Sequence, residues 1–458
     1  MISTRQKQSV IFVCILAFAF FSRVYRIHIP ERYMFDEVYH AVTAKLIARN
    51  DLRAFEWWNP PPEANTAVDW LHPPLAKYAQ AVSILMFGEN TFGWRFSSVI
   101  FGVICIALLY LLIQKLTGSI NIALLAAFLA SLDGLLLVQS RIAMNDIHVT
   151  AAILGTLLMY THYRKQKKPW QLFCTGILAG VSMGTKWSGV FSLGIIWTYE
   201  LLEYLRSELV SKAFFWNRLK RLFFVFWTRT ILLVLLPVCV YIASYGFMFY
   251  QGKDLIHLRD MHKQIWWYQT NLKATHPFES RPYQWFLDLR PVWMSVDYND
   301  SRVENIYAFG NPALFWLGDI AVVSTLLIWM HTIFTGIFAF FKKKHAAVRK
   351  SIASTIAAFL KSPLFFMVFS YAAVWMPWQF SPRIMFFYHY TPAVPFLASI
   401  LAYWLIKIWN ISQLHTAAVV ISVASIVLCF IMWYPHWTGL PVPVEFANAV
   451  YFALPGWK

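Results

Sequence analysis

The sequence predicts an all-α, polytopic membrane protein. Of its 458 residues, 59% are hydrophobic and only 13% are charged, whereas about a quarter of the residues are charged in ordinary soluble domains. Long apolar runs recur along the chain, and the basic residues between them gather in a few connections. The high hydrophobicity excludes disorder. Because the net charge of +17 belongs to such an apolar chain, it indicates membrane orientation, and we expect no nucleic-acid partner.

About eleven apolar segments approach the length of about 20 residues that a transmembrane helix needs. The first is expected to stay uncleaved, because it lacks a small-residue cleavage site and basic residues follow it directly. The expected spans are residues 8–27, 93–114, 119–138, 146–162, 170–185, 187–205, 229–250, 312–340, 363–378, 385–408 and 415–434. Together they predict one integral membrane domain over residues 1–458.

The charges between the spans predict how the chain is oriented. Arg5 and Lys7 lie before the first span, and three later connections are strongly basic, so these segments are expected in the cytoplasm. Two longer connections, residues 28–92 and 251–311, also hold many acidic residues and are predicted to be external loops. An odd number of spans places the C-terminus outside as well. We therefore expect a protein of the cell (inner) membrane whose active site faces the external or periplasmic side.

The first external loop contains two candidate segments. In FDEVYH, Asp36 and Glu37 are adjacent, and adjacent residues point in different directions on a helix. One of them can therefore face a reaction centre while the other anchors the loop. In LHPPLAKY, His72 and Lys77 flank a helix start that two prolines fix. The alternatives are an ordinary acidic loop and an interfacial helix start.

Three cations stand at the external ends of apolar spans, against the general charge pattern. Arg141 lies before Asp146 in DGLLLVQSRIAMND, Lys186 in GTKWSG, and Arg383 in SPRIMFFYHY. Charges at membrane depth are costly and indicate function, and such cations suit a lipid phosphate. The alternative for each is interfacial snorkelling. The sequence lacks a nucleotide-binding loop, so a lipid-linked donor fits better than a soluble nucleotide sugar.

Six segments together resemble the protein O-mannosyltransferase family, in its short prokaryotic form without a soluble β-trefoil domain. In chain order they are FDEVYH, HPPLAK, DGLLLVQSRIAMND, GVSMGTKWSGVF, ESRPYQWFLDLRPVWM and SPRIMFFYHYTPAVPF. The resemblance covers nearly the whole chain. It implies the C-type glycosyltransferase (GT-C) fold and transfer of mannose from a polyprenyl-phosphate carrier to Ser or Thr hydroxyl groups of exported proteins, with inversion at the anomeric carbon.

The resemblance also implies roles for individual residues. The acidic pair of the family falls on Asp36 and Glu37, and a carboxylate base is what an attacking hydroxyl group needs. We expect Asp36 to be that base. Fixed cations stabilise a leaving phosphate in the transition state, and the candidates are Arg141, Lys186 and Arg383. Four further residues are expected to support the site: His72, Lys77, Asp146 and His389.

Two other functions stay open at this point. A sister transferase of the same fold would move another sugar, such as aminoarabinose, to lipid A or a cell-envelope glycan. A secondary transporter would show paired, interrupted spans in two halves and charges near the middle of the bilayer. Expected partners of the transferase are polyprenyl-phosphate-mannose, acceptor proteins with Ser or Thr, membrane lipids and the protein export machinery. The five cysteines lie in apolar runs without metal-ligand spacing, and we expect no metal and no cofactor.

Overall fold

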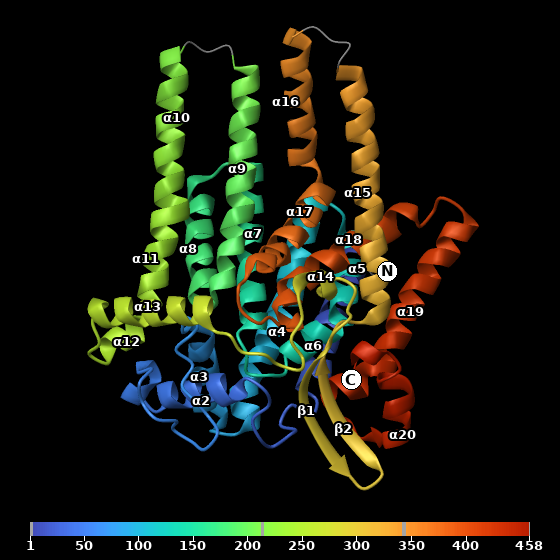
Figure 1. The fold of residues 1–458 in the computed structure, drawn as a ribbon. Coiled ribbons are helices and arrows are strands. Elements are labelled where there is room, and N and C mark those ends of the chain that lie inside the picture. Colours follow the sequence, from blue (N-terminus) through green and yellow to red (C-terminus); the bar gives the residue numbers. More distant parts are fainter. Residues whose placement is uncertain (1–2, 212–214, 341–344, 458) are drawn as a thin grey trace.

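The structure is a computed structural model that describes residues 3–211, 215–340 and 345–457. Long helices stand roughly side by side, and short helices and a small sheet gather at one end of the bundle (Figure 1). Helices occupy all of the predicted spans: α1 Thr4–Val24, α4 Thr91–Thr117, α5 Ile120–Ser131, α6 Gly134–Gln139, α7 Asp146–Gln166, α8 Pro169–Thr185, α9 Val190–Val210, α10 Phe215–Thr230, α11 Leu236–Ala243, α15 Pro312–Phe340, α17 Pro363–Trp375, α18 Val394–Ile408 and α19 Gln413–Thr438.

The protein is an integral membrane protein. Six of the described helices are long and apolar enough to cross a membrane, and a seventh results if the pair 352–361 and 363–380, bent by 79°, is one span. The remaining predicted spans are helical but shorter or more polar by this measure. The connection before residue 363, which the sequence suggested was a basic loop, contains a further helix, α16 His345–Lys361.

The third predicted span is broken into α5 and α6. Asp133 occupies the break, is fully buried, and caps α6 by accepting a hydrogen bond from the Leu136 N–H at 2.8 Å. Its second carboxylate oxygen accepts a hydrogen bond from the Asn311 N–H at 3.0 Å. An acceptor in a helix N-cap satisfies backbone donors that would otherwise be unpaired, so Asp133 ties α6 to the start of α15.

Both long loops are folded. The first carries α2 Glu37–Ala48, a short 3-10 turn at Leu52–Phe55, and α3 Leu75–Phe87; the second carries α13 Leu255–Asn271 and α14 Pro282–Trp285. The second loop also forms a hairpin of β1 Val292–Asn299 and β2 Arg302–Ala308, and β3 Val442–Pro443 pairs antiparallel with β2. The all-α prediction did not include this three-stranded sheet, although the helical fold class is confirmed.

The two loops are joined directly. The Arg32 guanidinium in the first loop donates to both carboxylate oxygens of Asp297 on β1, at 2.7 and 2.8 Å. In Figure 1, α2 and α3 lie at the same end of the bundle as the hairpin and the C-terminal segment. The structure therefore brings the two predicted external loops together into one layer over the helix ends.

Close packing of α8 against a neighbouring span places the end of α8 at this layer. A Cβ added at Gly176 on α8 would lie 2.1 Å from the Leu232 carbonyl oxygen, and one added at Gly180 would lie 2.7 Å from the Pro237 carbonyl oxygen. Glycine at these positions lets α8 pack against the backbone of the predicted span 229–250, which contains α11. Lys186 follows immediately after the end of α8, at the loop layer.

Candidate active site

A cavity of about 510 Å³ lies between the two loops and the ends of the helices. We call it the catalytic pocket. Its walls come from the first loop, from α7 and the end of α8, from the second loop, and from residues 383–389. Six of the nine residues predicted for the site line it: Asp36, His72, Asp146, Lys186, Arg383 and His389. Glu37, Lys77 and Arg141 do not.

Asp36 presents a carboxylate to the catalytic pocket. It occupies the N-cap position of α2 and is partly exposed there, and the Tyr388 hydroxyl donates a hydrogen bond to its Oδ2 at 3.3 Å. Burial raises the pKa of the Asp36 carboxyl group, although His40 and Lys186 nearby oppose the shift. A carboxylate with a raised pKa and access to a cavity is suited to accept a proton from a hydroxyl group.

Glu37 is fully buried behind the pocket wall. The Nε and Nη2 atoms of Arg95, on α4, each donate to one of its two carboxylate oxygens at 2.8 Å. The backbone N–H groups of Met34 and Ala143 donate to the same carboxylate at 2.9 and 3.0 Å. Since these four donors occupy it, Glu37 has no access to a substrate. Of the acidic pair, Glu37 is therefore the residue that anchors the loop, while Asp36 faces the pocket and only Asp36 can act on a substrate there.

Arg141 is also buried away from the pocket. Its guanidinium donates to the carbonyl oxygens of Arg23 and Tyr25, both at 2.6 Å, and to that of Arg26 at 3.4 Å. These carbonyl groups lie at the C-terminal end of α1, where a helix leaves acceptors unpaired and favours a cation. The predicted phosphate contact of Arg141 is corrected by this placement: Arg141 ties the end of α1 to the segment between α6 and α7.

Lys186 and Asp146 form a buried ion pair in the pocket wall, with Nζ 2.7 Å from Oδ1. Lys186 follows α8 and Asp146 begins α7, so two helix ends meet at this pair. The Lys186 ammonium also lies 5.5 Å from the ring centre of Tyr388, whose hydroxyl group binds Asp36. Among the described residues, Arg383 forms no hydrogen bond or ion pair, which leaves its guanidinium available to a ligand in the pocket.

Aromatic rings close the side of the pocket next to the second loop. Phe35 packs against Phe386 and Tyr388 at centroid distances of 5.7 and 5.9 Å, and His276 of the second loop lies 5.1 Å from Phe386. Behind them, Trp285 of the second-loop segment ESRPYQWFLDLRPVWM stacks on His389 at 6.1 Å. The second-loop motif therefore supports the wall that carries His389.

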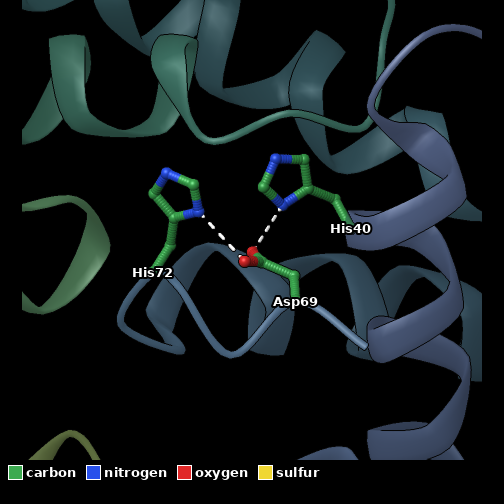
Figure 2. Close-up of side chains that lie close together, drawn as sticks. All are labelled: His40, Asp69 and His72. Carbon is green, nitrogen blue, oxygen red and sulfur yellow. Dashed lines mark hydrogen bonds and ion pairs between the residues drawn. The ribbon is translucent and has the colours of Figure 1, made fainter. Parts of the chain in front are cut away.

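The sequence interpretation missed Asp69, which is the centre of a buried polar cluster. His40 Nδ1 lies 2.8 Å from Asp69 Oδ2, and His72 Nδ1 lies 3.0 Å from Asp69 Oδ1 (Figure 2). The ammonium group of Lys77 lies 2.9 Å from Asp69 Oδ2 and donates to the carbonyl oxygens of Asp69 and His72. Burial by itself would raise the pKa of the Asp69 carboxyl group, but Lys77 and both histidines hold it well below its ordinary value.

Only part of this cluster could have been predicted from the sequence. Asp69 precedes His72 by three residues and Lys77 by eight, so the local part of the cluster was open to prediction. His40 comes from α2, and only the fold brings it to the same carboxylate. The ligand atoms of His40, Asp69 and His72 lie within 4.8 Å of one another, which is a spacing that a metal ion can share. Lys77 already supplies a cation to the carboxylate of this group.

Solved structures with the same architecture are membrane glycosyltransferases. The S. cerevisiae protein O-mannosyltransferase Pmt1-Pmt2 complex bound to the sugar donor aligns with a TM-score of 0.77 and 14% identity, over 100% of this chain and 93% of that chain. ArnT from Cupriavidus metallidurans aligns with a TM-score of 0.53 and 15% identity, over 93% of this chain and 64% of that chain. The structure thus has the C-type glycosyltransferase (GT-C) fold of these membrane proteins.

Sequence comparison makes the assignment more specific. Residues 13–250 match the dolichyl-phosphate-mannose-protein mannosyltransferase family, and residues 253–452 match the C-terminal four TMM region of protein-O-mannosyltransferase. Proteins named polyprenol-phosphate-mannose–protein mannosyltransferase from Corynebacterium glutamicum and Mycobacterium tuberculosis are 24% and 25% identical to it, over 85% of this chain and 81% of each relative. The chain belongs to the protein O-mannosyltransferase family, which confirms the resemblance of the six segments.

Proposed function

We propose that this protein transfers a mannosyl group from polyprenyl-phosphate-mannose to Ser or Thr hydroxyl groups of acceptor proteins. The observation that carries the proposal is one pocket in which the accessible carboxylate of Asp36 lies together with the cations Lys186 and Arg383. The membership of the chain in a family of protein mannosyltransferases supports the donor and the acceptor.

In the proposed reaction, Asp36 takes the proton of the acceptor hydroxyl group as its oxygen attacks the anomeric carbon. The new carbon–oxygen bond forms on one face of the sugar while the bond to the phosphate oxygen breaks on the other. The bonding electrons leave with the polyprenyl phosphate, and the configuration at the anomeric carbon inverts. Lys186 and Arg383 stabilise the negative charge that grows on the phosphate, which lowers the energy of the transition state more than that of the bound donor.

The same proposal includes the orientation in the membrane. The catalytic pocket, both long loops and the C-terminal segment lie at one end of the bundle (Figure 1). The basic connections between the spans predict that the opposite end is cytoplasmic. We therefore place the pocket and the C-terminus on the external side of the cell membrane, where acceptors delivered by the protein export machinery would reach it.

Transfer of aminoarabinose to lipid A is the competing function. The two family models, which together reach from residue 13 to residue 452, belong to protein mannosyltransferases, and this favours mannosyl transfer to protein. A transporter is disfavoured because the charges of the pocket lie at helix ends and loops, away from the middle of the bundle.

The test is transfer of radiolabelled mannose from polyprenyl-phosphate-mannose to a Ser/Thr-rich peptide by membranes that contain the protein. Asp36→Asn keeps the shape of the side chain but removes the base, and we expect transfer to fall by about 10²- to 10⁴-fold. Asp260→Asn, an exposed carboxylate on α13, is the matched control and should retain activity. Label in a lipid or glycan instead of the peptide would contradict the acceptor, and full activity of Asp36→Asn would contradict the base.

A further inference from the structure

The mechanism above leaves one wall of the catalytic pocket unexplained. His40 and His72 both line the pocket, and the carboxylate of Asp69 lies between them. Figure 2 shows the two imidazole rings on either side of this carboxylate, each with one nitrogen directed at it. The ring centres are 5.4 Å apart. The proposed reaction gives no role to this carboxylate or to the two histidines that it bridges.

The bridge determines which nitrogen of each ring carries hydrogen. An ionised carboxylate only accepts hydrogen bonds, so a neutral imidazole facing it must hold its hydrogen on the facing nitrogen, here Nδ1. Burial lowers the pKa of His72 to about 4, although Asp69 opposes the shift, so this ring is neutral near pH 7. Because Lys77 holds Asp69 in its ionised form, the cluster fixes one tautomer.

In the neutral form of each ring, this tautomer leaves Nε2 as a hydrogen-bond acceptor. In both rings this second nitrogen points away from Asp69 (Figure 2). Within the described part of the chain, neither Nε2 atom has a hydrogen-bond partner, and both residues line the cavity. An acceptor that faces the cavity without a partner from the protein favours ligands that carry hydrogen-bond donors.

The hydroxyl groups of a sugar are such donors. The wall formed by His40 and His72 is the part of the pocket that the phosphate and the base do not occupy. The phosphate belongs beside Lys186 and Arg383, and inversion requires Asp36 on the opposite side of the anomeric carbon. We propose that His40 and His72, held as Nε2 acceptors by Asp69, bind hydroxyl groups of the transferred sugar, and that Asp69 is a positioning residue that sets this specificity. The inference rests on the proposed function, because it takes the sugar donor as the ligand of the pocket.

A metal ion is the competing ligand of the same three side chains. Their spacing allows one, but the Lys77 ammonium lies 2.9 Å from Asp69 Oδ2 with almost no exposure to solvent. A divalent cation would have to bind beside this buried positive charge. The Lys77 ammonium and the His72 ring already contact this carboxylate, and so we favour the sugar subsite.

The experiment compares two ligands that differ only in the sugar. Purified full-length protein in lipid nanodiscs is titrated with polyprenyl-phosphate-mannose and with polyprenyl phosphate, without acceptor. In Asp69→Asn the amide offers one oxygen and one NH₂ group, so at least one histidine must adopt the other tautomer. We expect this variant and His72→Phe each to bind the mannosylated lipid about tenfold more weakly, as for one lost hydrogen bond, with unchanged affinity for polyprenyl phosphate. Lys186→Met should weaken both ligands.

His415→Asn changes a partly exposed histidine at the start of α19; it is the control and should match the wild type with both lipids. Equal losses for both lipids in Asp69→Asn and His72→Phe would overturn the subsite, because they would indicate that the cluster only maintains the shape of the pocket. Unchanged affinity for both lipids would also overturn it, as would a stoichiometric metal ion that the wild type carries and Asp69→Asn lacks. Equal affinity of the wild type for the two lipids would overturn the subsite as well, whereas a wild type that binds neither lipid would contradict the proposed donor. Thermal unfolding of each variant identifies one that has not folded, and His40→Asn then replaces it.

Discussion

The wall of the catalytic pocket and the packed junction behind it contain similar charged groups, but these groups differ in how many partners the protein gives them. In the junction, which we define by Glu37, Arg95 and Arg141, every charged group is buried and bound by several partners from the protein. In the wall, Asp36 has one hydrogen bond, from a tyrosine, and Arg383 has none among the described residues. A charge at membrane depth therefore indicates function only when the protein leaves part of its hydrogen-bonding capacity unused.

The largest expected effect tests the junction. Glu37→Ala leaves the Arg95 guanidinium buried without its counter-charge, and removing one partner of a buried pair costs about 3–5 kcal/mol of unfolding free energy. Asp36→Asn, one residue away, should unfold close to the wild type. Denaturant unfolding in detergent measures both. A stable but inactive Glu37→Ala protein would break the comparison, because it would give Glu37 a direct role in the reaction.

The next prediction separates the two kinds of cation. Lys186→Met removes a fixed charge from the pocket, and we expect kcat to fall by about 10²- to 10³-fold. Asp146→Asn keeps this cation while weakening its ion pair, so its loss of kcat should be smaller. Arg141→Met should lower the unfolding temperature, and the kcat of the fraction that remains folded should change little. The opposite pattern would return Arg141 to the phosphate site.

A smaller effect concerns the pH dependence of the base. Asp36 acts when deprotonated, so activity should fall as the pH drops through its pKa, which burial raises above the ordinary value for aspartic acid. The hydrogen bond from Tyr388 lowers that pKa. Tyr388→Phe should therefore move the acid limb of the kcat/KM profile to higher pH. Tyr250→Phe, an exposed tyrosine on α12 Gly246–Tyr250, serves as control, and an unmoved or lowered limb in Tyr388→Phe would argue against Asp36 as the titrating group.

The smallest expected effect is that of a chelator. Lys186 and Arg383 supply positive charge to the pocket, and Lys77 supplies it to Asp69. We therefore expect transfer of labelled mannose to be unchanged by EDTA. If EDTA abolished activity and Zn²⁺ or Mn²⁺ restored it, the cluster of His40, Asp69 and His72 would instead be a metal site.

The sequence predicted the helices because a bilayer imposes a length and a polarity on every span, and both can be read locally. It predicted Asp36 and Lys186 because charges beside apolar segments stand out. It assigned the base to Asp36 only through the resemblance, because the partner that holds Glu37 in the interior, Arg95, is 58 residues away. Arg141 was misassigned for the same reason: its carbonyl partners are more than 100 residues distant. Asp69 was missed because its second histidine, His40, arrives from another helix.

The hairpin of the second loop shows where this architecture can grow. The register of its strands shifts at a bulge between Trp293 and Ser295, near the base, and the ion pair of Asp297 with Arg32 ties β1 to the first loop closer to the turn. The turn at residues 299–302 is exposed and projects away from the bundle (Figure 1). Exposed tips of this kind tolerate the insertion of whole domains. A module inserted there would lie at the end of the bundle that holds the catalytic pocket, so the size of the enzyme can change while the residues that line the pocket stay the same.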